Sequence, residues 1–189
     1  MAEVLLFHHV QGLTDGVRAF ADDLREAGHT VHTPDLFEGR TFASLEEGMG
    51  FAREAGFGTL RERGAAAAEG LRPDLVYAGF SFGVTVAQKL AQTRPGARGA
   101  ILMHSCIPVT EFGDSWPDGV PVQIHGKEGD EFFDEDLPAA RELVKSASAA
   151  ELFVYRGDQH LFTDASLDAF DAEASALLRE RVHTFLSSV

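Results

Sequence analysis

The sequence predicts an α/β fold, in which a mostly parallel sheet of six strands is covered by helices on both faces. Short apolar runs alternate along the chain with longer segments whose apolar residues recur at helical spacing. The short runs are apolar throughout, as in strands that are buried on both faces. With 189 residues, of which 44% are hydrophobic, the chain can bury a full core. We therefore expect a single domain over residues 1–189.

The first two expected strands flank a helix. An apolar run over residues 4–8 predicts the first strand, and residues 30–33 predict the second. Between them, apolar residues over the range 17–27 recur every three or four positions and predict a helix. Gly28 ends that helix in the manner of a left-handed C-terminal glycine.

Residues 44–70 form a longer and less regular helical stretch. Four glycines interrupt it, namely Gly48, Gly50, Gly56 and Gly58. Because glycine weakens a helix, this stretch predicts two helices or a kinked one rather than one straight helix.

The most informative pattern covers residues 75–91, where a strand-like run over 75–78 meets the pentapeptide Gly79-Phe80-Ser81-Phe82-Gly83 and then a helical pattern. A G-x-S-x-G sequence between a strand and a helix is typical of a nucleophile elbow, in which a serine sits on a sharp turn. The glycines leave room where the bent backbone would collide with a Cβ atom. The same pentapeptide also occurs as an ordinary Gly-Ser turn, so a nucleophile requires a base, an acid and an oxyanion-hole donor elsewhere in the chain.

The second half of the chain continues the alternation, and the helix after the pentapeptide ends at Pro95. Further strands are expected at residues 99–104, 120–125 and 151–155, and further helices at 137–146 and 166–187. In parallel sheets of this kind, ligands bind at the carboxyl ends of the strands. The candidate site is therefore formed by the loops at residues 8–12, 36–43, 79–83, 104–118, 126–135 and 157–163.

The composition excludes several classes of protein. The formal net charge of −14 disfavours nucleic acids and anionic membrane surfaces as partners. The N-terminus has no cationic region and no stretch is long enough to cross a membrane, so we expect neither a signal peptide nor a membrane anchor. The single cysteine, Cys106, excludes an internal disulfide and fits a reducing compartment. We expect a cytoplasmic protein that is monomeric or homodimeric.

Two side chains in later loops have the chemistry that a serine nucleophile needs. A serine hydroxyl becomes nucleophilic when a base takes its proton, and a third group must orient that base. His160, in the last strand-to-helix loop, is the expected base, although it could instead cap the helix. Asp130 is the expected acid, because two glycines precede it and two phenylalanines follow it, which would turn it inward. The alternatives are Glu128, Glu131 and Asp134 in the same loop, and Asp158 beside the histidine.

The expected oxyanion hole uses two backbone N–H groups. Phe82, the residue after the serine, should supply the first, and the loop after the first strand should supply the second. Val10 is the expected donor in that loop, and His9 or Gln11 would take its place if the register differed by one residue.

Several short motifs occur in a set order along the chain. They are His9-Val10-Gln11-Gly12, Pro34-Asp35-Leu36-Phe37 with Gly39-Arg40, the pentapeptide around Ser81, His125-Gly126 leading to Asp130, and Tyr155 with Gly157 leading to His160 and Phe162. This ordered set resembles the dienelactone hydrolase family of α/β-hydrolases over nearly the whole chain. The resemblance implies a minimal α/β-hydrolase fold without a lid domain, with Ser81 as nucleophile, Asp130 as acid and His160 as base.

Two positions depart from the family pattern. The dienelactone hydrolase that gives the family its name has a cysteine in the elbow, where this chain has Ser81. That enzyme also has a glutamate in its first loop, where this chain has His9. Both differences indicate ordinary serine-esterase chemistry.

The expected substrate pocket combines aromatic walls with one cation. The resemblance places Arg40 near the site where the named enzyme grips its substrate's carboxylate, although Arg40 could instead pair with Glu38. Phe80 and Trp116 are the expected aromatic walls, although such side chains more often belong to the core. Cys106 lies outside any G-x-C-x-G context and is expected to have no catalytic role. Neighbouring histidines should diverge, so no metal site is expected.

These residues predict a serine hydrolase that cleaves a small ester, lactone or thioester through an acyl-enzyme intermediate, with no cofactor. Two alternatives use the same pocket. The protein could bind a small ligand without catalysis, or the triad could transfer the acyl group to an acceptor other than water or support perhydrolysis.

Overall fold

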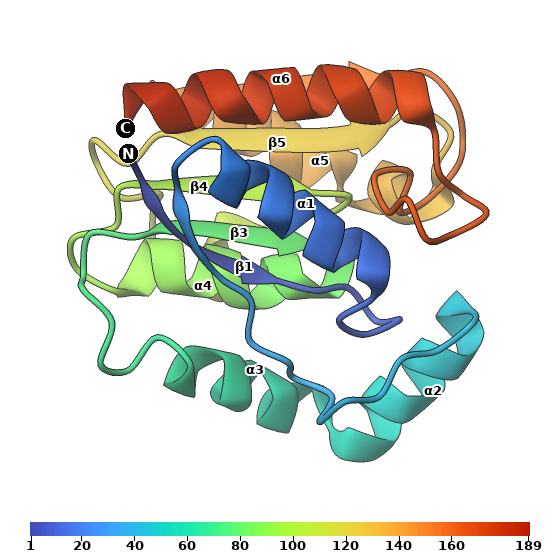
Figure 1. The fold of residues 1–189 in the computed structure, drawn as a ribbon. Helices are drawn as coiled ribbons and strands as arrows, with labels where there is room; N and C mark the ends of the chain where they lie inside the picture. Colours follow the sequence, from blue (N-terminus) through green and yellow to red (C-terminus); the bar gives the residue numbers. More distant parts are fainter.

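The computed structural model describes residues 1–189 and contains a six-stranded sheet (Figure 1). The strands are β1 (Glu3–Phe7), β2 (Thr30–His32), β3 (Val76–Phe80), β4 (Gly99–Met103), β5 (Val122–Lys127) and β6 (Ala150–Tyr155). They lie in the order β2-β1-β3-β4-β5-β6, and every neighbouring pair is parallel. The carboxyl ends of all strands therefore meet at one edge, and the predicted parallel α/β sheet is confirmed.

Six helices accompany the sheet. They are α1 (Asp15–Glu26), α2 (Leu45–Ala55), α3 (Phe57–Ala66), α4 (Val84–Thr93), α5 (Glu131–Ser146) and α6 (Ala172–Ser188), with 3₁₀ turns at Ser81–Gly83 and Val109–Glu111. Helices α1 and α6 pack on one face, and α3, α4 and α5 contribute to the apolar core on the other (Figure 1). Because both faces are covered, every residue of β3 and β4 is buried, which explains their uninterrupted apolar sequences.

The stretch over 44–70 folds as two helices, as its glycines predict. Ser44 caps α2 by accepting a hydrogen bond from the N–H of Glu47. Gly56 separates α2 from α3 and has a φ of +86°, a backbone conformation that glycine adopts without strain. The two helices contact each other, and α3 packs on α4.

Two helices begin at other residues than expected. Helix α5 begins at Glu131 rather than near Leu137, because the Asp130 carboxylate caps it by accepting a hydrogen bond from the N–H of Phe132. Helix α6 begins at Ala172 rather than near Ser166, where Asp171 is the capping residue. None of the helices is both long enough and apolar enough to pass through a membrane.

Candidate active site

Ser81 lies on the sharp turn that joins β3 to α4. Its φ of +48° is in the left-handed region, which residues other than glycine seldom adopt. A Cβ on Gly79 would overlap the backbone of Gly83, and a Cβ on Gly83 would overlap the carbonyl oxygen of Phe7 in β1. The two glycines thus allow the tight packing that presents the serine hydroxyl at the carboxyl edge of the sheet.

Three side chains from separate loops form one chain of hydrogen bonds. The Ser81 Oγ lies 2.8 Å from His160 Nε2, and His160 Nδ1 lies 2.7 Å from Asp130 Oδ2. Asp130 is 1% exposed and His160 is 9% exposed, so the bond between these two side chains is shielded from bulk water. A carboxylate at Nδ1 favours the tautomer in which Nδ1 carries the proton and Nε2 is free to accept one from Ser81.

The structure shows which of the candidate acids contacts His160. Asp130 is held in place because its other carboxylate oxygen caps α5. Glu128, Glu131 and Asp134 are exposed, and Asp158 is exposed and accepts a hydrogen bond from the side chain of Gln159. Among these carboxylates, only Asp130 is hydrogen-bonded to His160.

Two backbone segments border the space in front of Ser81. Phe82 is in the 3₁₀ turn that leads into α4, where the positive end of the helix dipole lies. Val10 is in the loop after β1, and its N–H donates to no group of the protein. The N–H of Gln11, by contrast, donates to the Nδ1 of His9 and is not free. This arrangement suits Phe82 and Val10 as paired donors to an oxyanion.

A cavity of about 260 Å³ opens in front of the triad. Its lining residues are Val10, Leu45, Met49, Phe57, Arg61, Ser81, Phe82, Thr85, His104, Ser105, Phe132, Glu135, Asp136 and His160. Side chains from α2, α3 and α5 supply its apolar wall. The ring of Phe132 packs 4.8 Å from the ring of His160, measured between centroids, and is 45% exposed, so it stands at the mouth of the cavity.

The three side chains expected to bind substrate lie elsewhere. Arg40 is exposed, and its guanidinium stacks over Phe51, 5.1 Å from the ring centroid. Phe80 is buried in the core on the α1 side of the sheet. Trp116 is buried in the opposite core, and its indole N–H donates to the carbonyl of Val120. None of the three lines the cavity, where Arg61 is the cation instead.

The remaining wall of the cavity is polar. The Asp136 carboxylate accepts hydrogen bonds from the Ser105 hydroxyl and the N–H of Cys106, while burial raises its pKa. Burial, with His160 nearby, holds the pKa of His104 well below its ordinary value, so this ring is neutral. Burial also raises the pKa of the Cys106 thiol to about 12, which leaves it protonated and unsuited to nucleophilic attack.

Sequence reasoning missed most of the apolar wall. Phe57, Met49 and Leu45 belong to the pair of helices that follows the second strand, and no motif marks them. The available signal was the length of this connection, because it begins at the carboxyl end of a strand, where ligands bind, and long connections often serve function. No group of three histidine, cysteine, aspartate or glutamate side chains is placed to hold a metal ion.

The whole chain matches one family model, described as the dienelactone hydrolase family, over residues 1–189. No curated protein is detectably similar in sequence. Among solved structures, a dienelactone hydrolase-like promiscuous phosphotriesterase from metagenomic libraries is 19% identical, with a TM-score of 0.78, over 100% of this chain and 86% of its own. A metagenome-derived lipolytic enzyme is 15% identical, with a TM-score of 0.73, over 100% of this chain and 94% of its own.

A third similar structure is the dienelactone hydrolase from Anabaena variabilis, with 15% identity and a TM-score of 0.66 over 100% of this chain and 86% of its own. At these identities the structural similarity establishes the α/β-hydrolase fold, and the family model adds the family. The chain belongs to the dienelactone hydrolase family of hydrolases.

Proposed function

We propose that this protein is a serine hydrolase that cleaves a small carboxylic ester, lactone or thioester through an acyl-enzyme intermediate. The hydrogen-bonded chain from Ser81 through His160 to Asp130, at the edge of a cavity, carries the proposal. A serine on a strained turn, a histidine and a buried carboxylate in this order are the parts that acyl transfer requires.

The proposed reaction begins when Ser81 Oγ attacks the carbonyl carbon and its proton passes to His160 Nε2. The oxyanion that forms accepts hydrogen bonds from the N–H groups of Phe82 and Val10. Asp130 accepts from Nδ1–H and stabilises the imidazolium. His160 then protonates the departing alcohol or thiol, and the same steps with water release the acid and restore Ser81.

The cavity supports a small and largely apolar substrate. Its volume of about 260 Å³ is just below the usual range for ligand pockets, roughly 300–1,000 Å³. Phe57 and Phe132 supply flat apolar surface, whereas Arg61 and Asp136 supply charge of both signs. The single cysteine of the chain supports a cytoplasmic location for this activity.

Hydrolysis of p-nitrophenyl acetate by the wild type and by Ser81→Ala tests the proposal. Loss of the nucleophile should lower kcat by at least about 10³-fold. Ser175→Ala is the matched control, because Ser175 is a buried serine of α6 whose hydroxyl has no partner, and it should hydrolyse the ester at the wild-type rate.

A fluorophosphonate probe supplies the second measurement. The probe should label the wild type and Ser175→Ala but not Ser81→Ala, and mass spectrometry should locate the adduct on Ser81. Equal hydrolysis by wild type and Ser81→Ala would remove Ser81 as the nucleophile. A folded wild type that neither hydrolyses esters nor reacts with the probe would favour a ligand-binding role.

A further inference from the structure

The peptide group between His9 and Val10 is held from its carbonyl side. The His9 carbonyl oxygen accepts hydrogen bonds from the N–H of Gly12, at 3.0 Å, and from Nδ1 of His8, at 2.7 Å. The chain has no cis peptide bonds, so the N–H of Val10 points away from both donors. Fixing the carbonyl therefore fixes the direction of the N–H that is proposed to bind the oxyanion.

One backbone donor sets the tautomer of His8. The N–H of Leu36 donates to His8 Nε2 at 3.0 Å, so the ring proton must be on Nδ1, where it reaches the His9 carbonyl. Burial lowers the pKa of His8 to about 4, and the ring is neutral near pH 7. His8 is therefore a dedicated donor to the peptide that carries the Val10 N–H.

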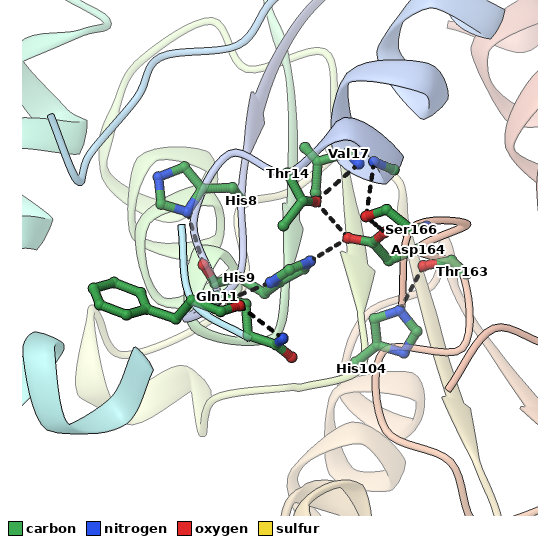
Figure 2. Close-up of polar contacts among 11 residues, drawn as sticks. His8, His9, Gln11, Thr14, Val17, His104, Thr163, Asp164 and Ser166 are labelled. Carbon is green, nitrogen blue, oxygen red and sulfur yellow. Dashed lines mark hydrogen bonds and ion pairs between the residues drawn. The ribbon is translucent and has the colours of Figure 1, made fainter. Parts of the chain in front are cut away.

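A backbone donor also sets the tautomer of His9. The N–H of Gln11 donates to His9 Nδ1, so the ring proton is on Nε2 and is donated to Asp164 Oδ2 at 2.8 Å. Figure 2 shows the His9 ring between these two partners. His9 is fully buried and Asp164 is 3% exposed, so this is a second histidine–aspartate pair beside the triad.

Asp164 is anchored at the N-terminus of α1. The Thr14 hydroxyl donates to Oδ2, and the N–H and hydroxyl of Ser166 donate to Oδ1 (Figure 2). Burial would raise the pKa of Asp164, but these bonds and the one from His9 outweigh it and lower the pKa to about 2. A Cβ on Gly16 would overlap the carboxylate, so the helix is shaped to receive it.

The pair connects two loops that serve the reaction. Asp164 follows the catalytic base by four positions on one loop, and His9 immediately precedes Val10 on the other. We propose that His9 and Asp164 are positioning residues, which fix the position of the Val10 N–H group relative to His160. This proposal rests on the proposed serine-hydrolase function and deepens it.

A purely structural pair would affect stability alone, whereas a positioning pair affects the transition state selectively. The test compares Asp164→Asn and His9→Leu with His9→Gln, whose amide places an N–H donor near the position of Nε2. The matched control is His183→Leu, which breaks another histidine–aspartate pair, formed with Asp23 at 3.0 Å on the surface of α6 and α1.

The kinetic readout uses p-nitrophenyl acetate, together with inhibition by phenylboronic acid, whose adduct on Ser81 places an oxygen in the oxyanion hole. Removal of one oxyanion donor typically lowers kcat by about 10²–10³-fold, so a displaced donor in Asp164→Asn or His9→Leu should lower it by about 10- to 100-fold. KM should stay within about twofold, and boronate affinity should fall in parallel with kcat/KM. His9→Gln should recover most of the loss, and His183→Leu should match the wild type.

Unchanged kcat and boronate affinity in folded His9→Leu and Asp164→Asn would overturn the proposal, as would equal losses in His9→Gln and His9→Leu. If Asp164→Asn does not fold, Ser166→Ala removes one bond to Asp164 and should still lower kcat several-fold with KM unchanged. The Val10 amide resonance in ¹⁵N NMR is independent of catalysis. It should shift in Asp164→Asn and not in His183→Leu, even in a protein that fails to hydrolyse esters, and an unmoved resonance counts against the positioning role.

Discussion

Substitution of Gly48 by alanine sets two physical effects against each other. Gly48 is buried in α2, and a Cβ there would overlap the carbonyl oxygen and carbon of Val10 and lie 3.2 Å from the N–H nitrogen of Gln11. Gly50, two residues later in the same helix, is exposed and has open space around its Cβ position. The two glycines therefore separate the effect of helix propensity from the effect of contact with the Val10 loop.

Alanine is favoured over glycine inside a helix by about 1 kcal/mol, so Gly50→Ala should raise the free energy of unfolding by about that amount. Gly48→Ala receives the same gain, but forcing an atom into a packed site costs about 1–3 kcal/mol. The net result should be a protein about 1 kcal/mol less stable than the wild type. A misplacement of about 1 Å can cost about 10²-fold in rate, so displacement of the loop that carries the Val10 N–H should lower kcat by about 10- to 100-fold.

Urea unfolding and p-nitrophenyl acetate kinetics measure both quantities on the same two variants. Gly50→Ala should be more stable than the wild type, with an unchanged kcat. If Gly48→Ala were stabilised as much as Gly50→Ala and kept the wild-type kcat, the close packing of α2 on the Val10 loop would not position that loop for the reaction.

The other predictions concern single side chains. Asp130→Asn should keep the fold and lower kcat by about 10³–10⁴-fold, because the amide no longer fixes the tautomer of His160, and a kcat within tenfold of the wild type would contradict this role. Burial lowers the pKa of His8 to about 4 and that of His125 to about 3. The unfolded chain therefore binds more protons than the folded one below pH 6.5, and the free energy of unfolding should fall as pH drops from about 6.5 towards 4. Urea titrations at several pH values measure this fall. The fall should be smaller in His125→Phe, which lacks one of the two histidines. Cys106 should react with a thiol reagent such as DTNB only after unfolding, and rapid labelling of the native protein would refute its burial.

The order and spacing of the motifs were sufficient to predict the sheet and the three side chains of the candidate triad. Parallel strands bring their carboxyl ends to one edge, so loops far apart in sequence become neighbours once the strands are recognised. The choice of Asp130 among several acids rested on local sequence. The structure adds the physical reason, because the same carboxylate also begins α5.

The pocket walls could not be predicted in the same way. Phe80 precedes Ser81 directly, but side chains alternate along a strand, and Phe80 shares the face of Val76 and Ala78 towards α1 and α6. Nearness in sequence to the serine therefore indicated the wrong side of the sheet. Arg61 and Phe57 reach the cavity through the packing of α3, a tertiary arrangement that local patterns do not encode.

Part of the cavity wall and the residues of the candidate triad come from different segments of the chain, which separates the shape of the pocket from the chemistry. Four lining residues, Leu45, Met49, Phe57 and Arg61, come from one continuous segment that contributes nothing to the triad. An exchange of this short segment would therefore reshape the proposed substrate pocket and leave Ser81, His160 and Asp130 in place. The exception is Gly48, where α2 touches the Val10 loop, so a transplanted segment must keep a glycine at that position to remain compatible with the chemistry beneath it.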